Sequence, residues 1–186
     1  PSGAGKTSLC DRLLAEFDWI QYSVSCTTRP PRGREINGVD YEFVTPERFD
    51  EYINNNAFLE HADVHGYKYG TRRAPVLQAL ESGKSILMDI DVQGAEQIRD
   101  ATDLVDGIMR DAFLDIFIEP PSLDALEARL AGRGEDAPDV IAKRLQNAIE
   151  EMRHSASYTH HVVNDDFDQA FAELRQIVYT QAQDFS

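Results

Sequence analysis

The sequence predicts an α/β fold in which helices cover both faces of a largely parallel β-sheet. Apolar runs of strand length alternate along the chain with longer segments whose apolar residues recur at helical spacing, and this alternation is typical of parallel sheets. A glycine-rich turn leads directly into the first expected helix. We find no internal repeat, low-complexity tract or linker, so the 186 residues are expected to form one domain.

Helix boundaries in the first half of the chain are marked by capping residues. Thr45 followed by Pro46 indicates a helix start, because threonine is a good N-cap and proline is favoured at the first helical position. Gly83 indicates a helix end, and His65-Gly66 a turn. The expected elements are a helix over 5–16, a strand over 21–26, β-like pieces over 41–44 and 57–64, a helix over 46–54 and a helix over 72–82.

The second half shows the same alternation. Ser122 is a good N-cap for one of its helices. The expected elements are strands over 85–90 and 113–118, a helix from 122 to about 131, a helix over 138–156, a strand over 161–163 and a helix over 167–184.

Composition excludes several classes of protein. The 33 Asp and Glu against 18 Lys and Arg give a net charge of −15, which argues against general affinity for nucleic acid but not against binding of small phosphates. No run approaches the ~20 apolar residues of a membrane span. Cys10 and Cys26 are too few for a disulfide framework. A cytoplasmic protein with no nucleic-acid or membrane partner is expected.

The first eight residues carry a phosphate-binding pattern. They follow G-x-x-x-x-G-K-[ST] from its second position onward. The glycines let backbone N–H groups turn toward phosphate oxygens, the lysine reaches the β- and γ-phosphates, and the threonine hydroxyl suits Mg²⁺. A turn that caps a helix and binds nothing is the alternative. The residues expected to bind the phosphates of a nucleoside triphosphate are Ser2, Gly3, Ala4, Gly5, Lys6, Thr7 and Ser8.

The pattern's first glycine, and the buried strand that normally leads into such a loop, do not precede Pro1. We therefore expect the natural protein to extend N-terminally by about one strand, ~5–6 residues plus a start.

Five longer stretches carry a family resemblance. They are Ser23-Val24-Ser25-Cys26-Thr27-Thr28-Arg29-Pro30-Pro31-Arg32, Glu35-Ile36-Asn37-Gly38-Val39-Asp40-Tyr41, Phe58-Leu59-Glu60, Tyr67-Lys68-Tyr69-Gly70-Thr71 and Asp89-Ile90-Asp91-Val92-Gln93-Gly94. With the phosphate loop, they resemble the signatures of guanylate kinases over nearly the whole chain. The resemblance implies a P-loop NTPase-type parallel sheet flanked by helices, with a small mixed α+β GMP-binding subdomain and a helical lid. The implied ranges are a core of residues 1–26, 72–121 and 157–186, a GMP-binding region at about 27–71 and a lid at about 122–156.

The resemblance implies transfer of the γ-phosphoryl group of ATP to GMP or dGMP, with Mg²⁺. Arginine forks match phosphate oxygens, and a carboxylate matches the two N–H donors on the edge of guanine. The implied contacts to GMP are Arg29, Arg32, Tyr41 and Tyr69 at the phosphate, and Ser25, Glu60, Thr71 and Asp91 at the base. Taken singly, such residues also fit solvent-facing positions.

The segment around residues 132–138 resembles the family's lid over ATP. Because the acceptor phosphate is mostly a dianion at pH 7, no general base is needed, and catalysis reduces to in-line positioning and charge neutralisation. The implied catalytic residues are Lys6, Arg32, Arg133 and Arg144. Ion pairs on helix surfaces are the alternative for the lid arginines.

The remaining implied contacts concern ATP, the phosphoryl donor, and its Mg²⁺ ion. Arg129 and Arg133 are expected at ATP, and Thr7 and Asp89 at Mg²⁺. Asn164 lies either near the adenine, as the resemblance implies, or at the cap of the last helix.

Three features depart from the family pattern. In residues 31–35 the glycine lies one position earlier than in the family pattern, and Arg34 takes its usual place. Glu135 replaces a threonine of the lid. The segment 95–119 is longer than is usual in the family, with 104–112 as the expected insertion. Two other functions are open at this point. One is a non-catalytic guanylate-kinase-like module that binds phosphopeptides, although such modules lose the phosphate loop. The other is a different small-molecule kinase, which would not need the base-edge residues. A monomer and a homodimer both fit.

Overall fold

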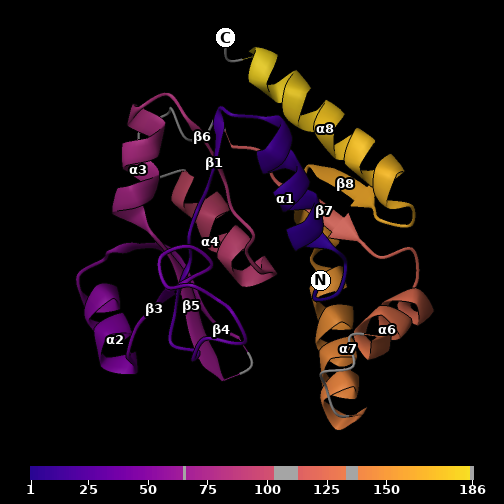
Figure 1. The fold of residues 1–186 in the computed structure, drawn as a ribbon, viewed down its shortest axis with the longest axis horizontal. Helices are drawn as coiled ribbons and strands as arrows, with labels where there is room; N and C mark the ends of the chain where they lie inside the picture. The colour runs from indigo at the N-terminus through magenta and orange to yellow at the C-terminus, as the bar shows by residue number, and fades with distance from the viewer. Residues whose placement is uncertain (65, 103–112, 133–137, 185–186) are drawn as a thin grey trace. The chain divides into compact units, whose positions relative to one another are not determined.

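The computed structural model describes residues 1–64, 66–102, 113–132 and 138–184 (Figure 1). They form two compact units, one of Pro1–Ala15 with Asp111–Ser186 and the other of Glu16–Arg110. The helices are α1 (Lys6–Glu16), α2 (Pro46–Asn54), α3 (Arg73–Glu81), α4 (Val92–Thr102), α6 (Leu123–Gly132), α7 (Pro138–Arg153), the 3₁₀ turn Ser155–Ser157 and α8 (Phe167–Asp184). The strands are β1 (Ile20–Tyr22), β2 (Cys26–Thr27), β3 (Glu42–Phe43), β4 (Phe58–Val64), β5 (Tyr67–Arg72), β6 (Ser85–Leu87), β7 (Ile116–Glu119) and β8 (His160–Val163).

The unit of Glu16–Arg110 contains two sheets. β1 and β6 pair in parallel, and the second sheet has the order β3-β2-β5-β4, in which β5 runs antiparallel to both neighbours. The Ser23 N–H still bonds to the Leu87 carbonyl at 2.9 Å, and the chain then leaves the first sheet for the second. The expected strand over 21–26 is therefore two short strands in different sheets.

Helix α2 begins as the sequence predicts. The Thr45 side chain accepts a hydrogen bond from the Arg48 N–H at 3.2 Å, and Pro46 is the first helical residue. The helix buries Phe49 against Cys26 and Phe58. Burial raises the pKa of the Cys26 thiol to about 12, so this cysteine stays protonated and serves as a core residue.

Strand β4 contains a bulge where it carries its acidic residue. Phe58 pairs with Arg72 but Glu60 pairs with Thr71, so the register shifts between them. Three consecutive residues (58–60) are buried as a result, whereas burial alternates in the rest of the strand. A bulge re-aims the side chains beside it, and here it turns the Glu60 carboxylate into the interior of its unit.

The other unit is built on the parallel pair β7–β8, with Phe117 opposite His161. Helix α8 packs on β8 and runs alongside it (Figure 1). Asp166 caps α8 by accepting the Gln169 N–H at 2.9 Å. Helices α6 and α7 pack together through Leu126, Leu130 and Ala148.

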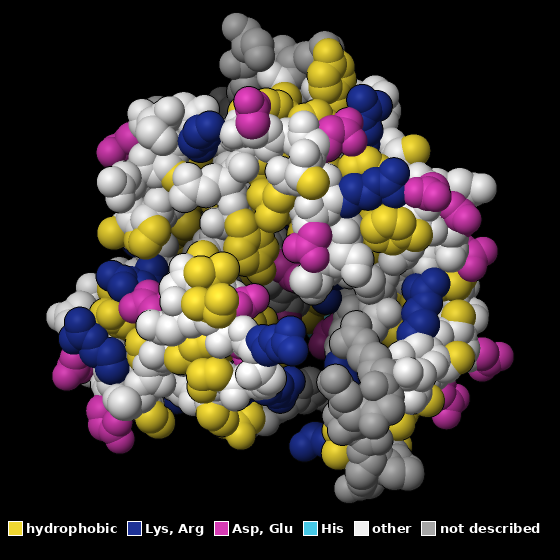
Figure 2. Space-filling model, viewed as in Figure 1, with side chains coloured by type: hydrophobic (Ala, Val, Ile, Leu, Met, Phe, Trp, Pro, Cys, Tyr) yellow, Lys and Arg dark blue, Asp and Glu magenta, His cyan; other side chains and the backbone are white. Residues whose placement is uncertain are grey.

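Several expected boundaries were wrong by a few residues, and one helix was not expected. β6 ends at Leu87 and β7 begins at Ile116, so both strands are shorter than their apolar runs. Helix α4 was absent from the sequence-based expectation. The expected insertion over 104–112 lies outside the described residues. No helix in the described ranges is long and apolar enough to cross a membrane. On the face drawn in Figure 2, acidic side chains are scattered among basic ones.

Candidate active site

The phosphate-binding turn is held open by glycine at the point where α1 begins. Gly3 and Gly5 have φ angles of 86° and 91°, in the left-handed region that glycine alone adopts readily. A Cβ on Gly5 would lie 2.3 Å from the Asn164 Nδ2 atom. The turn therefore needs glycine both for its backbone angle and for this close approach.

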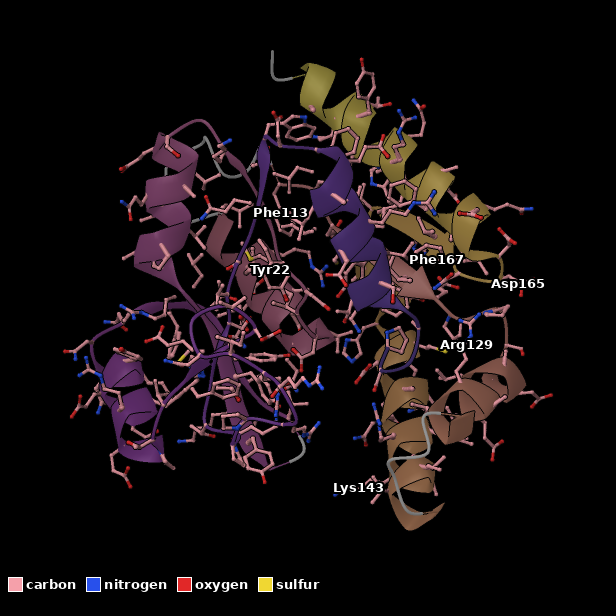
Figure 3. The ribbon with its side chains drawn as sticks, viewed as in Figure 1. Tyr22, Phe113, Arg129, Lys143, Asp165 and Phe167 are labelled. Carbon is pink, nitrogen blue, oxygen red and sulfur yellow. The ribbon has the colours of Figure 1, made fainter. Side chains whose placement is uncertain are left out.

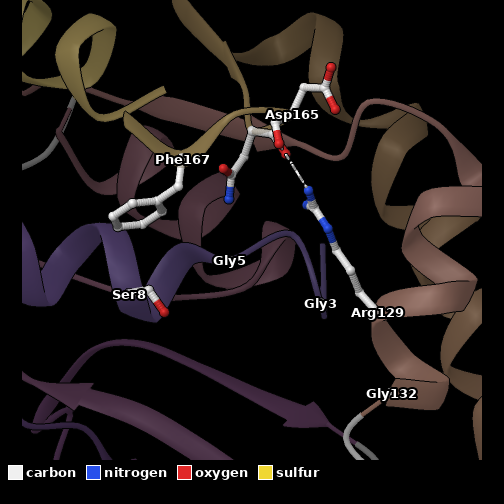
Figure 4. Close-up of a pocket in the computed structure, with 8 residues that line it drawn as sticks. Gly3, Gly5, Ser8, Arg129, Gly132, Asp165 and Phe167 are labelled. Atoms are coloured by element: carbon white, nitrogen blue, oxygen red, sulfur yellow. Dashed lines mark hydrogen bonds between the residues drawn. The ribbon is translucent and has the colours of Figure 1, made fainter. Parts of the chain in front are cut away.

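Asn164 ties the turn to the end of β8. It is only 5% exposed, and its Nδ2 donates to the Ala4 carbonyl at 2.7 Å. Its own N–H bonds to the Glu119 carbonyl at 2.8 Å, at the end of β7. The main-chain carbonyl of Asn164 accepts a hydrogen bond from the Arg129 Nη2 at 2.8 Å (Figure 4). Asn164 thus joins the phosphate turn, the sheet and α6, and the capping of α8 falls to Asp166 instead.

Two cationic side chains contact the same turn. The Lys6 Nζ donates to the Pro1 carbonyl at 3.1 Å, and the Arg144 Nη2 donates to the Ser2 Oγ at 2.8 Å. The Ser2 N–H donates to the Glu151 Oε2 at 3.3 Å. The structure therefore brings Arg144 to the turn that carries Ser2 and Lys6, although Arg144 lies 142 positions after Ser2 in the sequence.

A pocket of about 420 Å³ adjoins this turn. Figure 3 shows Arg129 reaching from α6 toward the segment that carries Asp165. Its guanidinium donates to main-chain carbonyls and forms one wall of the pocket. The pocket is lined by Gly3, Gly5, Ser8, Arg129, Gly132, Asn164, Asp165 and Phe167.

In the unit of Glu16–Arg110, Arg29 lies at the centre of an aromatic and acidic cluster. It is 4% exposed and donates to the Glu35 carboxylate through both terminal nitrogens, at 2.9 and 2.8 Å. Its Nε donates to the Tyr69 hydroxyl at 3.1 Å, and its guanidinium lies 5.2 Å from the centre of the Tyr41 ring. Burial raises the pKa of Tyr41, and the nearby Tyr69 and Asp89 raise it further. Three of the residues expected at the GMP phosphate are thus in contact.

Glu35 is the member of this cluster that the sequence did not single out. The Arg29 guanidinium lowers the pKa of the Glu35 carboxyl, and a hydrogen bond of 2.6 Å from the Arg32 N–H lowers it as well. The Arg32 side chain itself is exposed. The signal that points to Glu35 is its position three residues after Arg32, which lets one carboxylate close the loop and hold Arg29.

Glu60 is a buried acid beside a buried hydroxyl. It is 4% exposed, and burial raises its pKa to about 7, with the negative charge of Asp91 adding to the rise. Thr71 opposes the rise through its hydroxyl and N–H. The Thr71 Oγ1 nevertheless makes no hydrogen bond of standard geometry to any described residue, so burial is the dominant effect on Glu60. Ser25 is also buried, at 8% exposure.

Asp91 lies at the start of α4, where its Oδ1 accepts the Gly94 N–H at 2.9 Å. Its Oδ2 accepts a hydrogen bond from the Gln93 Nε2 at 3.2 Å. The structure therefore gives Asp91 a capping role, and its expected contact with guanine stays a prediction. Of the two residues expected at Mg²⁺, Thr7 is exposed on α1 and Asp89 is half-buried after β6, in different units.

Comparison with known proteins decides the family. A sequence model of the guanylate kinase family matches residues 1–181. The chain belongs to the guanylate kinase family. The guanylate kinase of Alkalilimnicola ehrlichii is 45% identical over 95% of this chain and 83% of its own length. That of Syntrophotalea carbinolica is 47% identical over 97% and 82%. The crystal structure of guanylate kinase from Anaplasma phagocytophilum aligns with a TM-score of 0.76 at 31% identity, over 96% of this chain and 81% of that one.

The resemblance inferred from the motifs is thereby confirmed, as is the P-loop NTPase-type α/β fold. As a guanylate kinase family member the chain is an enzyme, a nucleoside-monophosphate kinase, and the alternative of a non-catalytic module is not supported. Two departures from the family pattern, Glu135 and the segment 104–112, lie outside the described residues, as does the expected catalytic residue Arg133. Arg34 is exposed.

Proposed function

We propose that the protein transfers the γ-phosphoryl group of ATP to GMP or dGMP, producing ADP and GDP or dGDP. The observation that carries this proposal is the pair formed by Glu60 and Thr71. A buried carboxylate and a buried hydroxyl without a full set of partners are costly for a fold, and the edge of a guanine base supplies what they lack. Guanine offers two N–H donors to the carboxylate and further edge atoms to the hydroxyl.

The same pair explains selection against adenine. Adenine presents a single amino group and no N1–H, so it would leave the Glu60 carboxylate partly unpaired. A site built to hydrogen-bond one base rejects an analogue by up to about 10⁴–10⁵. Ser25 and Asp91 are proposed as further contacts to the guanine edge, and Arg29, Arg32, Tyr41 and Tyr69 as contacts to the GMP phosphate.

On the donor side, we propose that the turn of Ser2–Ser8 holds the β- and γ-phosphates of ATP. The N–H groups at the start of α1 favour anions. Lys6, which now donates to a neutral carbonyl at 3.1 Å, has a stronger partner in a phosphate oxygen. The 420 Å³ pocket beside Arg129 and Asn164 is proposed to receive the adenosine part.

Mg²⁺ is proposed to enter with ATP. The Thr7 hydroxyl follows Lys6 on the first turn of α1 and suits this hard cation, as does the Asp89 carboxylate. In the described part of the chain no three His, Cys, Asp or Glu side chains gather in a metal-binding cluster. An Mg²⁺ ion that enters with ATP takes most of its ligands from phosphates and water. Bound there, Mg²⁺ would neutralise charge on the transferred group.

The protein's own contribution to the reaction is positioning. The GMP phosphate is largely a dianion near pH 7 and attacks without a general base. Lys6 and Arg144, which both contact the phosphate turn, and the arginines Arg32 and Arg133 are proposed to neutralise the transferred group and to hold donor and acceptor in line.

An assay of ADP release with GMP, dGMP, AMP and UMP as acceptors, and with no acceptor, tests the proposal. GMP should be the best acceptor, and omission of Mg²⁺ should abolish turnover. If AMP or UMP were the better substrate, the assignment of Glu60 and Thr71 to a guanine edge would be wrong.

A further inference from the structure

The first turn of α4 lies directly against the Glu60 carboxylate. A Cβ on Gly94 would come within 2.5 Å of the Glu60 Oε2 and 3.0 Å of its Cδ. Both residues are buried. Any side chain at position 94 would therefore occupy the space that the carboxylate now fills.

Helix α4 is fixed to β4 at the residue after Glu60. The Gln97 Oε1 accepts the His61 N–H at 3.1 Å, and the Gln97 Nε2 donates to the His61 carbonyl at 2.7 Å. The amide of Gln97 thus pairs with both main-chain groups of one strand residue, as a neighbouring strand would. Gly94 and Gln97 lie three positions apart and so lie on one side of the helix.

The donors at the start of α4 are directed away from Glu60. The Gly94 N–H bonds to the Asp91 Oδ1 at 2.9 Å, and the Ala95 N–H bonds to the Asp91 carbonyl at 3.0 Å. Glu60 is therefore in contact with α4, but its carboxylate does not cap the helix. The shape of this turn limits where the carboxylate can lie, and the N–H groups of the turn do not take up its hydrogen-bonding capacity.

We propose that Gly94 and Gln97 are positioning residues for guanine recognition: Gln97 docks α4 beside Glu60, and Gly94 leaves the space that fixes where its carboxylate lies. This inference rests on the proposed function, because it attributes the preference for guanine over hypoxanthine to the position of the Glu60 carboxylate. Hypoxanthine lacks the 2-amino group, so a correctly placed Glu60 carboxylate helps to distinguish the two bases.

Gly94→Ala is the main test. The carboxylate is the mobile end of its side chain and can rotate away from a new methyl group, and alanine is a better helix former than glycine. The variant should therefore fold with no fall in Tm. Its kcat/KM for GMP should fall by about tenfold or more, since misplacement by ~1 Å can cost up to about 10²-fold. Its kcat/KM for inosine monophosphate should change much less, so the ratio of the two should fall.

Gln97→Leu should lower the same ratio to a smaller extent, and Glu96→Ala, on the exposed side of α4, should leave it unchanged. A double-mutant cycle isolates the coupling. Adding Gly94→Ala to Glu60→Ala should produce no further loss in kcat/KM for GMP, because there is no carboxylate left to displace.

The outcomes separate the two proposals. If Gly94→Ala lowered turnover of both substrates equally, or cost as much without Glu60 as with it, the positioning role would be refuted while the assignment of Glu60 stood. If Glu60→Gln kept full preference for GMP, the proposed guanine contact would fail, and the selectivity assigned to Gly94 and Gln97 would fail with it.

Discussion

Arg29 and Glu35 form a two-point ion pair, with nitrogen–oxygen distances of 2.9 and 2.8 Å, in which the arginine is almost fully buried. A guanidinium presents five donors in a fixed fork. Here it uses two on Glu35, one on the Tyr69 hydroxyl and one on the Pro30 carbonyl. The carboxylate therefore sets the direction in which the Arg29 fork points, and the proposed contact of Arg29 with the GMP phosphate should depend on Glu35.

Glu35→Gln should raise the KM for GMP by about tenfold, because a charge-assisted hydrogen bond contributes about 1.5–3 kcal/mol and a neutral amide orients Arg29 less firmly. The KM for ATP should stay constant. Steady-state kinetics with each substrate varied in turn measures both values. Glu51→Gln is the matched control, since Glu51 pairs with Arg48 on the exposed surface of α2. An unchanged KM for GMP would mean that the pair is purely structural.

Glu60→Gln should lower kcat/KM for GMP by roughly 10²-fold, because the amide replaces a charged acceptor with one acceptor and two mismatched donors. The KM for ATP should hardly change. Glu81→Gln, at the exposed end of α3, controls for loss of one negative charge. Equal effects on both substrates would indicate that Glu60 maintains the fold and does not contact the base.

The raised pKa of Glu60 also predicts a pH dependence of GMP binding. Burial raises its pKa from 4.5 to about 7, and the N–H donors of guanine need the ionised form. The KM for GMP should therefore rise more steeply as the pH falls below about 7 in the wild type than in Glu60→Gln, in which the GMP phosphate still titrates but position 60 does not. A pH profile that is the same in both proteins would contradict this role.

The same shift has a consequence for stability. Because the pKa of Glu60 is higher in the folded protein than in the unfolded chain, the folded state binds the proton more tightly. Its contribution to the free energy of unfolding is greatest below pH 4.5 and falls as the pH rises to about 7. The loss is at most roughly 3 kcal/mol, at about 1.4 kcal/mol per pH unit. Glu60→Gln should thus gain Tm over the wild type at pH 8 but little at pH 5.

Much of the fold was predictable, because its signals are local. Thr45 and Pro46 determine the start of α2 through their own backbone and side chain, and the glycine-rich turn leads into α1 at Lys6. The strand over 21–26 was not predictable as two strands. Its residues form one short run, and only the pairing with β6 and then with β5 shows that the chain changes sheets after Ser23.

The site was predictable in its residue types but not in its contacts. The motifs identify Arg29 and Glu60, yet the bulge that turns Glu60 inward depends on pairing with β5. The hydrogen bonds between Gln97 of α4 and His61 of β4 involve residues that carry no motif of their own. Asn164 stands in a cluster of three capping residues. Its place against Gly5, rather than at the cap of α8, is decided by packing across 159 positions of the sequence.

Arg133→Ala should lower kcat much more than it weakens GMP binding, since its proposed contact is to the transferred phosphoryl group. Calorimetry with GMP, beside turnover measurements, separates the two effects. Lys143→Ala removes an exposed cation from α7 and should leave both unchanged. A normal kcat in Arg133→Ala would assign this arginine to the solvated surface.

Asn164→Asp should separate the ATP side of the site from the GMP side. The Asn164 Nδ2 donates to the Ala4 carbonyl at 2.7 Å in a buried position, and an aspartate would place an acceptor against an acceptor. Leaving the carbonyl unpaired costs about 1–3 kcal/mol, which lowers the Tm of a domain of this size by roughly 5 °C. Because the carbonyl belongs to the phosphate turn, the KM for ATP should rise by about tenfold, whereas GMP affinity stays constant.

Asn55→Asp is the matched control for Asn164→Asp. Its amide also donates to a main-chain carbonyl, that of Glu51 at 2.8 Å, but on the exposed end of α2. That control should leave the KM for ATP unchanged. If Asn164→Asp lost Tm but kept its KM for ATP, Asn164 would support the sheet alone, and the phosphate turn would hold its shape through Gly5 and the first turn of α1.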